Sequence, residues 1–142
     1  MTQLPEFDDA RVRAAVDAIG APWTESPTGG TVTFFRSGYF VPAATEDKLI
    51  LTGLLDLDLD AQLRDAAVEA VETWHRTRWF PKATCSEVSV EDGCFRVLIE
   101  TTAYYEHGVS DAQLESQLRS FIAAAEELAQ EMAQTLGVTP DW

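Results

Sequence analysis

The spacing of apolar residues along the chain predicts a short helix first. It begins after Phe7, with Asp8 as its N-cap, and ends at Gly20. Its buried stripe follows helical spacing and consists of Val12, Ala15, Val16 and Ile19. A loop rich in proline, glycine, serine and threonine follows from Ala21 to Gly30.

β-branched, aromatic and alternating positions predict three strands after this loop. They span Thr31–Arg36, Tyr39–Val41 and Lys48–Leu59, with a tight turn at Ser37-Gly38. Pro42 ends the second strand or marks it as an edge. Leucines share one face of the third strand, namely Leu49, Leu51, Leu55, Leu57 and Leu59, whereas Ile50 and Leu54 are apolar exceptions on the other face.

A second helix is predicted from about Asp60 to Arg76, and Pro81 prevents its continuation. Two strands, Ala83–Val90 and Cys94–Tyr104, then flank Asp92-Gly93, a strong signal for a two-residue turn. Such a turn pairs Val90 with Phe95, Val88 with Val97 and Ser86 with Ile99, which places these side chains on one apolar face.

The same register pairs Cys94 with Glu91, roughly 20 Å along the strand from Cys85. A disulfide needs Cα atoms within about 7 Å, so both thiols are expected to be free. Leu98 lies on the polar face of this hairpin, and a scattered apolar surface residue is ordinary.

The last helix has the clearest local signals. Ser110 and Gln113 form a capping box, Val109 and Leu114 form a hydrophobic staple, and Gly137 ends the helix. At about 1.5 Å per residue it spans roughly 40 Å, longer than a small sheet is wide. Its far end therefore needs another surface. Two interpretations are open for Leu128, Met132 and Leu136. They are core positions, or they form a face that binds a second copy or another partner.

The element order is therefore α-β-β-β-α-β-β-α. It predicts an α+β fold in which helices flank a mainly antiparallel, five-stranded sheet. The length of 142 residues fits one domain over residues 1–142, with its core at about 8–136.

Composition limits the kinds of molecule that the chain is expected to bind. The formal net charge is −14, which opposes binding to nucleic acid and to anionic membranes but permits polypeptide partners. No stretch approaches the ~18 consecutive apolar residues of a transmembrane helix. Acidic residues stand near the N-terminus where a signal peptide would be basic and then apolar, so we expect a cytoplasmic protein.

The densest local signal is a basic and aromatic run at the end of the second helix. As a binding segment for an acidic peptide or an anionic ligand, it would use Trp74, His75, Arg76, Arg78, Trp79 and Lys82. The structural interpretation is a helix end at which cations complement the helix dipole and the aromatic side chains turn into the core.

Signals for chemistry are weak elsewhere. The Leu55–Asp60 run alternates leucine and aspartate but lacks the glycine and glutamate of a calcium loop, so we expect neither a metal nor another cofactor. His75 and His107 are the only residues that titrate naturally near neutral pH, and surface positions are their default. With no nucleophile motif or phosphate loop, we assign no catalytic residue and expect a protein that is not an enzyme.

Two stretches resemble the YbjN family, described as bacterial sensory-transduction regulators. They are Trp74–Ala83, at the end of the middle helix, and His107–Leu114, at the entry to the last helix. Glu72 and His75 stand where the family pattern leads us to expect asparagine. The resemblance implies a fold similar to type III secretion chaperones, which are small, acidic, often homodimeric and non-enzymatic.

Together these observations favour a cytoplasmic, non-enzymatic regulatory or chaperone-like protein that binds another polypeptide. A homodimer is a further expectation. The alternative is a regulator that binds a small anionic ligand near Arg76, Arg78 and Lys82.

Overall fold

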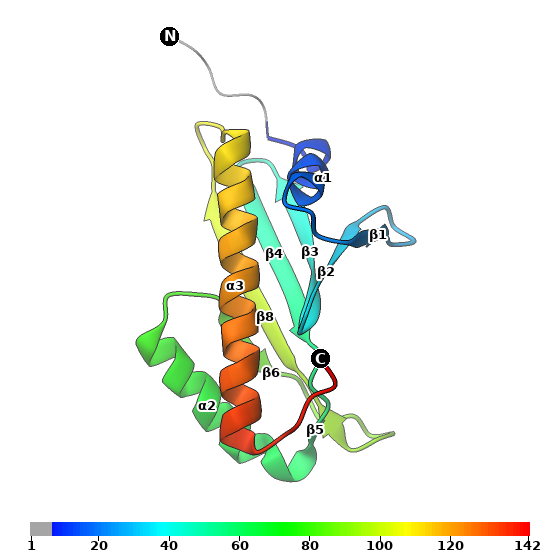
Figure 1. Cartoon of the computed structure of the whole chain (residues 1–142), viewed down its shortest axis with the longest axis vertical. Helices are drawn as coiled ribbons and strands as arrows, with labels where there is room; N and C mark the ends of the chain where they lie inside the picture. Colours follow the sequence, from blue (N-terminus) through cyan, green and yellow to red (C-terminus); the bar gives the residue numbers. More distant parts are fainter. Residues whose placement is uncertain (1–6) are drawn as a thin grey trace.

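An antiparallel sheet of six strands forms the centre of the molecule in the computed structural model, which describes residues 7–142 (Figure 1). The strand order is β1-β2-β3-β4-β8-β6. The strands are β1 (Trp23–Glu25), β2 (Thr31–Phe35), β3 (Gly38–Thr45), β4 (Lys48–Leu55), β6 (Lys82–Cys85) and β8 (Val97–Tyr104). A separate pair joins β5 (Leu59–Asp60) to β7 (Cys94–Phe95). The predicted α+β class is confirmed, with six strands in the main sheet instead of five.

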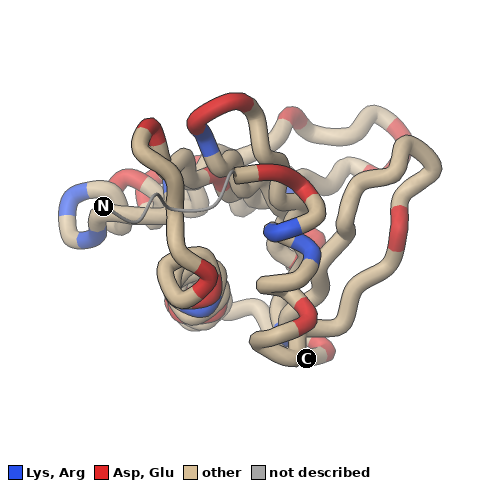
Figure 2. Tube along the Cα trace, turned by 90° about the horizontal axis from the view of Figure 1, so that it is seen from above, with Lys and Arg blue, Asp and Glu red and all other residues tan. Residues whose placement is uncertain are grey.

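The helices of the described residues pack on one face of this sheet. They are α1 (Asp9–Ala18), α2 (Arg64–Thr77), which a short 3-10 turn at Ala61–Leu63 precedes, and α3 (Asp111–Leu136). Helix α3 runs lengthwise in front of β4 and β8, with α1 beside its first half and α2 beside its last half (Figure 1). Seen from above, acidic positions are distributed around the whole trace, with the basic positions between them (Figure 2). Within residues 7–142, no helix is long and apolar enough to span a membrane.

Local signals set the start of α1 and both ends of α3 as predicted, whereas α2 begins at Arg64, later than the predicted start near Asp60. The Arg11 backbone N–H donates to the Asp8 carboxylate at 2.9 Å, which caps α1. Ser110 and Gln113 form both hydrogen bonds of the capping box of α3. Gly137 ends α3 in the left-handed region, at φ 67°, where a side chain would be strained.

Alternation along β4 divides the sheet into a covered face and an outer face. Leu49, Leu51 and Leu55 are fully buried beneath the helices, whereas Ile50 and Leu54 point to the outer face and are half-buried. On the covered face the rings of Phe40 and Phe121 meet edge to face, 5.0 Å between centroids, and join the sheet to α3.

Gly53 allows β3 and β4 to approach closely beneath this aromatic pair. A Cβ atom at position 53 would lie 2.4 Å from the Tyr39 carbonyl oxygen and 2.8 Å from the Phe40 Cβ. Both neighbours belong to the paired strand, so neither can move without disturbing the ladder.

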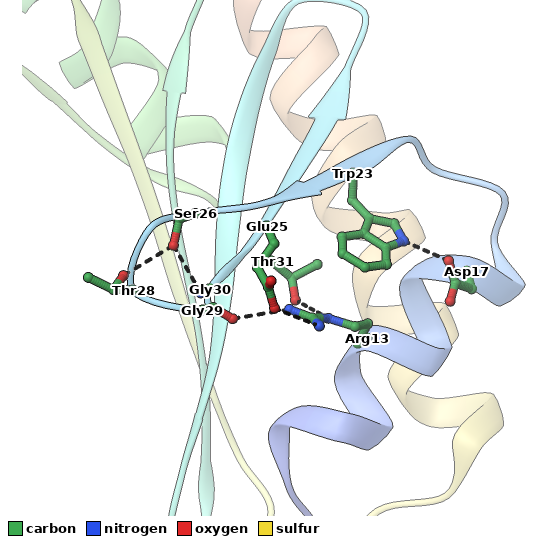
Figure 3. A network of polar contacts seen from close by, with 9 residues as sticks. All are labelled: Arg13, Asp17, Trp23, Glu25, Ser26, Thr28, Gly29, Gly30 and Thr31. Carbon is green, nitrogen blue, oxygen red and sulfur yellow. Dashed lines mark hydrogen bonds and ion pairs between the residues drawn. The ribbon is translucent and has the colours of Figure 1, made fainter.

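Strand β1 lies within the segment that we predicted as a loop, and contacts from α1 hold it in place (Figure 3). The guanidinium of Arg13 lies 4.5 Å from the Trp23 ring and donates to the Thr31 hydroxyl and the Gly29 carbonyl. The Trp23 indole N–H donates to Asp17 at 2.6 Å. These are tertiary contacts, so the local sequence pattern did not reveal the strand.

Strand β3 continues through Pro42 to Thr45, beyond the predicted end at Val41. Pairing with β2 ends at Phe40, so Pro42 lies where β3 pairs with β4. The proline therefore occupies a locally unpaired edge, which agrees with the second of the two interpretations.

The predicted register of the later hairpin was wrong. Cys85 pairs with Val97 and Ala83 with Ile99, a shift of three residues. The turn closes across residues 90–93, because the Ser89 N–H donates to the Cys94 carbonyl at 2.8 Å. Phe95 pairs with Leu59 instead of Val90, and Val90 is fully exposed in the turn. Both thiols are free, as predicted.

The Gly53→Ala substitution tests the close approach of β3 and β4. Because the added methyl group meets backbone atoms, we expect a loss of about 1–3 kcal/mol in the free energy of unfolding, measured by urea denaturation. Thr52→Ala, at the exposed neighbouring position, is the control. Equal stability of the two variants would contradict this account of Gly53.

Candidate functional site

The basic and aromatic run occupies the last turns of α2, the loop at residues 78–81 and the first residue of β6. Trp74 is buried, with 2% of its surface exposed, and packs in the core. Its indole N–H donates to the Pro81 carbonyl at 3.0 Å. This hydrogen bond fixes the far end of the loop to the helix before it.

His75 also has a structural contact. The Ala83 backbone N–H donates to its Nε2 atom at 3.0 Å, which joins α2 to β6. Arg76 is exposed, and its guanidinium contacts only its own helix among the described residues, at the Glu72 carbonyl and the Thr73 hydroxyl. Arg76 is therefore the freer of these two side chains.

Arg78 joins the loop to α3. Its Nη2 atom donates to Glu127 at 2.6 Å and to Glu131 at 3.2 Å, and its guanidinium lies 5.2 Å from the Trp74 ring. The hydrogen bond and the negative charge of Glu127 raise the pKa of Arg78 above its ordinary value. The charge of Arg78 is thus matched within the chain.

Trp79 differs from its neighbours because its side chain is entirely exposed, at 102% of the reference area. The residues around it are fixed: Pro81 is buried, and the Arg78 N–H donates to the Trp74 carbonyl at 2.8 Å. Lys82 is exposed on β6 and pairs in register with Glu100. The structure therefore resolves the run into a fixed base, formed by Trp74, His75 and Arg78, and an exposed group, formed by Arg76, Trp79 and Lys82.

The far half of α3 is covered within the chain. Leu128 and Met132 are each 1% exposed, and Leu136 is half-buried against the core. Helix α2 packs here and leaves a groove of about 280 Å³, whose rim carries Glu69 and Glu131. Leu128 and Met132 are therefore core positions that do not offer the exposed partner face considered from the sequence.

A second cleft, of about 530 Å³, lies between α1 and strands β2 and β3. Its cation, Arg13, already binds Thr31, Glu25 and the Gly29 carbonyl (Figure 3). The donors of this guanidinium thus hold β1 and its loop in place.

The aspartates of the Leu55–Asp60 run have structural partners. Asp60 accepts a hydrogen bond from the Gln62 N–H at 2.9 Å and caps the turn before α2. Asp58 accepts one from Arg96 Nε at 2.6 Å. Over residues 7–142 the structure shows no group of three or more His, Cys, Asp and Glu side chains suited to a metal ion.

The pKa values of both cysteines lie above the ordinary thiol value. Burial raises the pKa of Cys85. Desolvation raises that of Cys94, and the nearby carboxylates Asp92, Asp58 and Asp60 raise it further. Neither environment activates a nucleophile, because the thiolate is the reactive form.

These pKa shifts predict slow alkylation and a pH-dependent stability. In the native protein, iodoacetamide should modify both thiols more slowly at pH 8 than in the urea-unfolded chain. The stability from the protonated thiols is complete below the unfolded pKa of about 8.5 and is lost as pH rises through the raised native pKa. Equal alkylation rates in native and unfolded protein would contradict the assignment.

Comparison with solved structures supports the fold. The crystal structure titled "Crystal structure of YbjN, a putative transcription regulator from E. coli" matches with a TM-score of 0.77 at 11% sequence identity. The match covers 97% of this chain and 99% of that chain. No curated protein matches the sequence.

Comparison with family models shows family membership as well as fold, because it compares the sequence itself. The model of the YbjN family, described as "Putative bacterial sensory transduction regulator", matches residues 9–134, from the first residue of α1 to near the end of α3. This range includes nearly the whole folded core. The chain therefore belongs to the YbjN family.

Proposed function

We propose that this chain is a regulator that acts by binding another polypeptide, and that Trp79 is the main anchor for that partner. The observation that carries the proposal is a fully exposed tryptophan on a loop that the protein itself fixes. Tryptophan and arginine are enriched among the residues that dominate binding energy at protein interfaces. Trp79 supplies the first, and Arg76, three residues earlier, the second.

Rigidity of the loop supports this role. An anchor that is already ordered loses little conformational freedom when it binds. Here the Trp74–Pro81 and His75–Ala83 hydrogen bonds hold the two sides of the loop, and Arg78 holds it against α3. The indole of Trp79 is thus presented to solvent by a backbone that need not rearrange.

The alternative, a small anionic ligand held by Arg76, Arg78 and Lys82, receives less support. Such a site needs several cations to converge on one anion. Arg78 instead binds Glu127 and Glu131, and an added anion would have to approach those two carboxylates. Arg76 and Lys82 remain for a partner, where they can pair with carboxylates around an apolar contact.

We expect this regulator to bind its partner without catalysing a reaction. The Nε2 atom of His75 accepts a backbone hydrogen bond, and His107 lies exposed in the turn before α3. The raised pKa values of both cysteines disfavour the reactive thiolate. We place this activity in the cytoplasm, where free thiols stay reduced.

Trp79→Ala tests the proposal in a crosslinked pull-down from native lysate. Removing the indole should weaken capture of a stoichiometric partner by about 2 kcal/mol or more, roughly 30-fold. Val90→Ala is the matched control, because Val90 is equally exposed on a different loop, and it should capture the partner normally.

Thermal unfolding checks that both variants fold, and we expect melting temperatures close to that of wild type because neither side chain is packed. Equal capture by Trp79→Ala and wild type would contradict the proposal. A metabolite that raises the melting temperature of wild type but not of Arg76→Ala would instead support the anionic-ligand alternative.

A further inference from the structure

One edge of the central sheet is open along half of β8. On one side, β8 pairs with β4 as far as Tyr104, the last residue of the strand. On the other side, β8 pairs with β6 only as far as Glu100, which lies opposite Lys82. Within residues 7–142, no strand lies beside Thr101–Tyr104 on that side, and the yellow end of β8 is bare there in Figure 1.

The backbone groups of this open stretch point outward along the edge. The Tyr105 N–H, directly after β8, donates to the Asp47 carbonyl on the β4 side. Backbone groups alternate in direction along a strand, so those of the odd-numbered residues of β8 face β4. The N–H and C=O groups of Thr102 and Tyr104 therefore face the open side and are available to a further strand.

Other open edges of the sheet carry protection that this stretch lacks. Sheets avoid unwanted pairing by means of proline, charged groups or covering elements at their edges. Pro42 offers no N–H on the open stretch of β3, and the Asp9 carboxylate accepts the Ala44 N–H there at 2.8 Å. On the outer edge of β6, the Ala83 N–H donates to His75. The open stretch of β8 reads Thr-Thr-Ala-Tyr, without proline or charge, and threonine and tyrosine favour strands.

Uncharged polar side chains border this stretch on the helix side. A shallow hollow of about 410 Å³ lies between Tyr105 and the first half of α3, where it is lined by Ala112, Gln113, Ser116, Gln117 and Ser120. The Thr101 hydroxyl is buried and has no hydrogen-bond partner within residues 7–142. Amides and hydroxyls both donate and accept hydrogen bonds, so uncharged polar side chains suit this side of an added strand.

The open stretch begins where the Trp79 loop ends. Because Lys82 lies opposite Glu100, the loop at residues 78–81 reaches the sheet beside the start of Thr101–Tyr104. The Pro81 carbonyl accepts the Trp74 indole N–H, which ties the loop to α2. At ~3.3 Å per residue, Trp79 lies within about 10 Å of Lys82. A segment paired with β8 is therefore within reach of the exposed indole.

We propose that the partner polypeptide adds an extended segment to the open edge of β8, as a further strand of the sheet. This inference rests on the proposed function, because it describes how the partner anchored at Trp79 is bound. Main-chain hydrogen bonds with Thr102 and Tyr104 supply affinity, and alternate side chains of the segment supply specificity.

The two faces of the added strand meet different surroundings. On the outer face, the side chains of Thr102 and Tyr104 are exposed, and Tyr104 is 68% exposed. Aromatic and β-branched side chains pair well with such neighbours across a sheet. The segment therefore carries aromatic or β-branched residues on this face, alternating with uncharged polar residues on the face toward α3.

Short random peptides displayed on phage are the probe, selected against the purified full chain. Enriched peptides should show this alternation and should bind the Thr102→Pro variant at least about tenfold more weakly than wild type. Proline removes the N–H at the open edge and leaves the pairing with β4 intact, because that N–H faces away from β4. Thr102→Ala is the matched control: it loses the side chain but keeps the N–H, so its affinity should change by no more than about twofold.

Amide hydrogen exchange measured by NMR locates a bound peptide without a variant. Saturating peptide should slow exchange of the Thr102 and Tyr104 amides by at least about tenfold, because each gains a hydrogen bond. The Thr101 and Ala103 amides face β4 and should exchange slowly with and without peptide. These alternate positions on one strand are an internal control.

Trp79→Ala separates strand addition from the role of Trp79. If this variant weakens peptide binding while the saturated complex still protects Thr102 and Tyr104, both proposals are supported. If Thr102→Pro weakens binding and Trp79→Ala does not, strand addition stands and Trp79 is not the anchor.

Strand addition is overturned if no peptide binds wild type better than the Thr102→Pro variant. It is also overturned if a bound peptide leaves the Thr102 and Tyr104 amides in fast exchange. Protection of these amides that increases with the concentration of the chain alone would overturn it as well, because a second copy would then occupy the edge. If the Thr102→Pro variant fails to fold by circular dichroism, the exchange experiment on wild type decides.

Discussion

The lengthwise packing of α3 on one face of the sheet is the contact on which the rest of this fold depends. Phe121 of α3 meets Phe40 of β3, and Gly53 leaves the room that lets β3 and β4 lie close beneath them. Helices α1 and α2 then pack against α3 and against the same side of the sheet. Glu126 of α3 even accepts a hydrogen bond from the Arg36 backbone at the β2–β3 turn.

The partly exposed outer face of the sheet and the fixed loop at Trp79 both follow from this one-sided arrangement. Because the described helices gather on one face, Tyr39 and Leu98 on the other face each remain about 40% exposed. Because α3 extends past the sheet centre to α2, Glu127 and Glu131 can hold Arg78 and fix the loop that presents Trp79.

The parts of the fold that the sequence predicted are those determined by neighbouring residues. The cap at Ser110, the stop at Gly137 and the alternation of leucines along β4 each depend on a few adjacent positions. Strand β1 and the partner of Phe95 could not be predicted in this way, because Arg13 and Leu59, distant in sequence, determine them. In the candidate site, composition identified the segment, but only tertiary contacts separate the buried Trp74 from the exposed Trp79. The sequence marks Leu54 and Leu98 as apolar exceptions on polar faces, and only the strand register shows that these two residues are paired neighbours.

The most direct test of the one-sided fold is methyl NMR of the full chain with a soluble paramagnetic agent. The account predicts strong broadening for Leu98, Ile50 and Leu54 on the outer face. It predicts little for Leu49, Leu51 and Ile99, which alternate with them on the same strands and are at most 1% exposed. Equal protection of both sets of methyl groups would show that the outer face is covered as well and would contradict the one-sided arrangement.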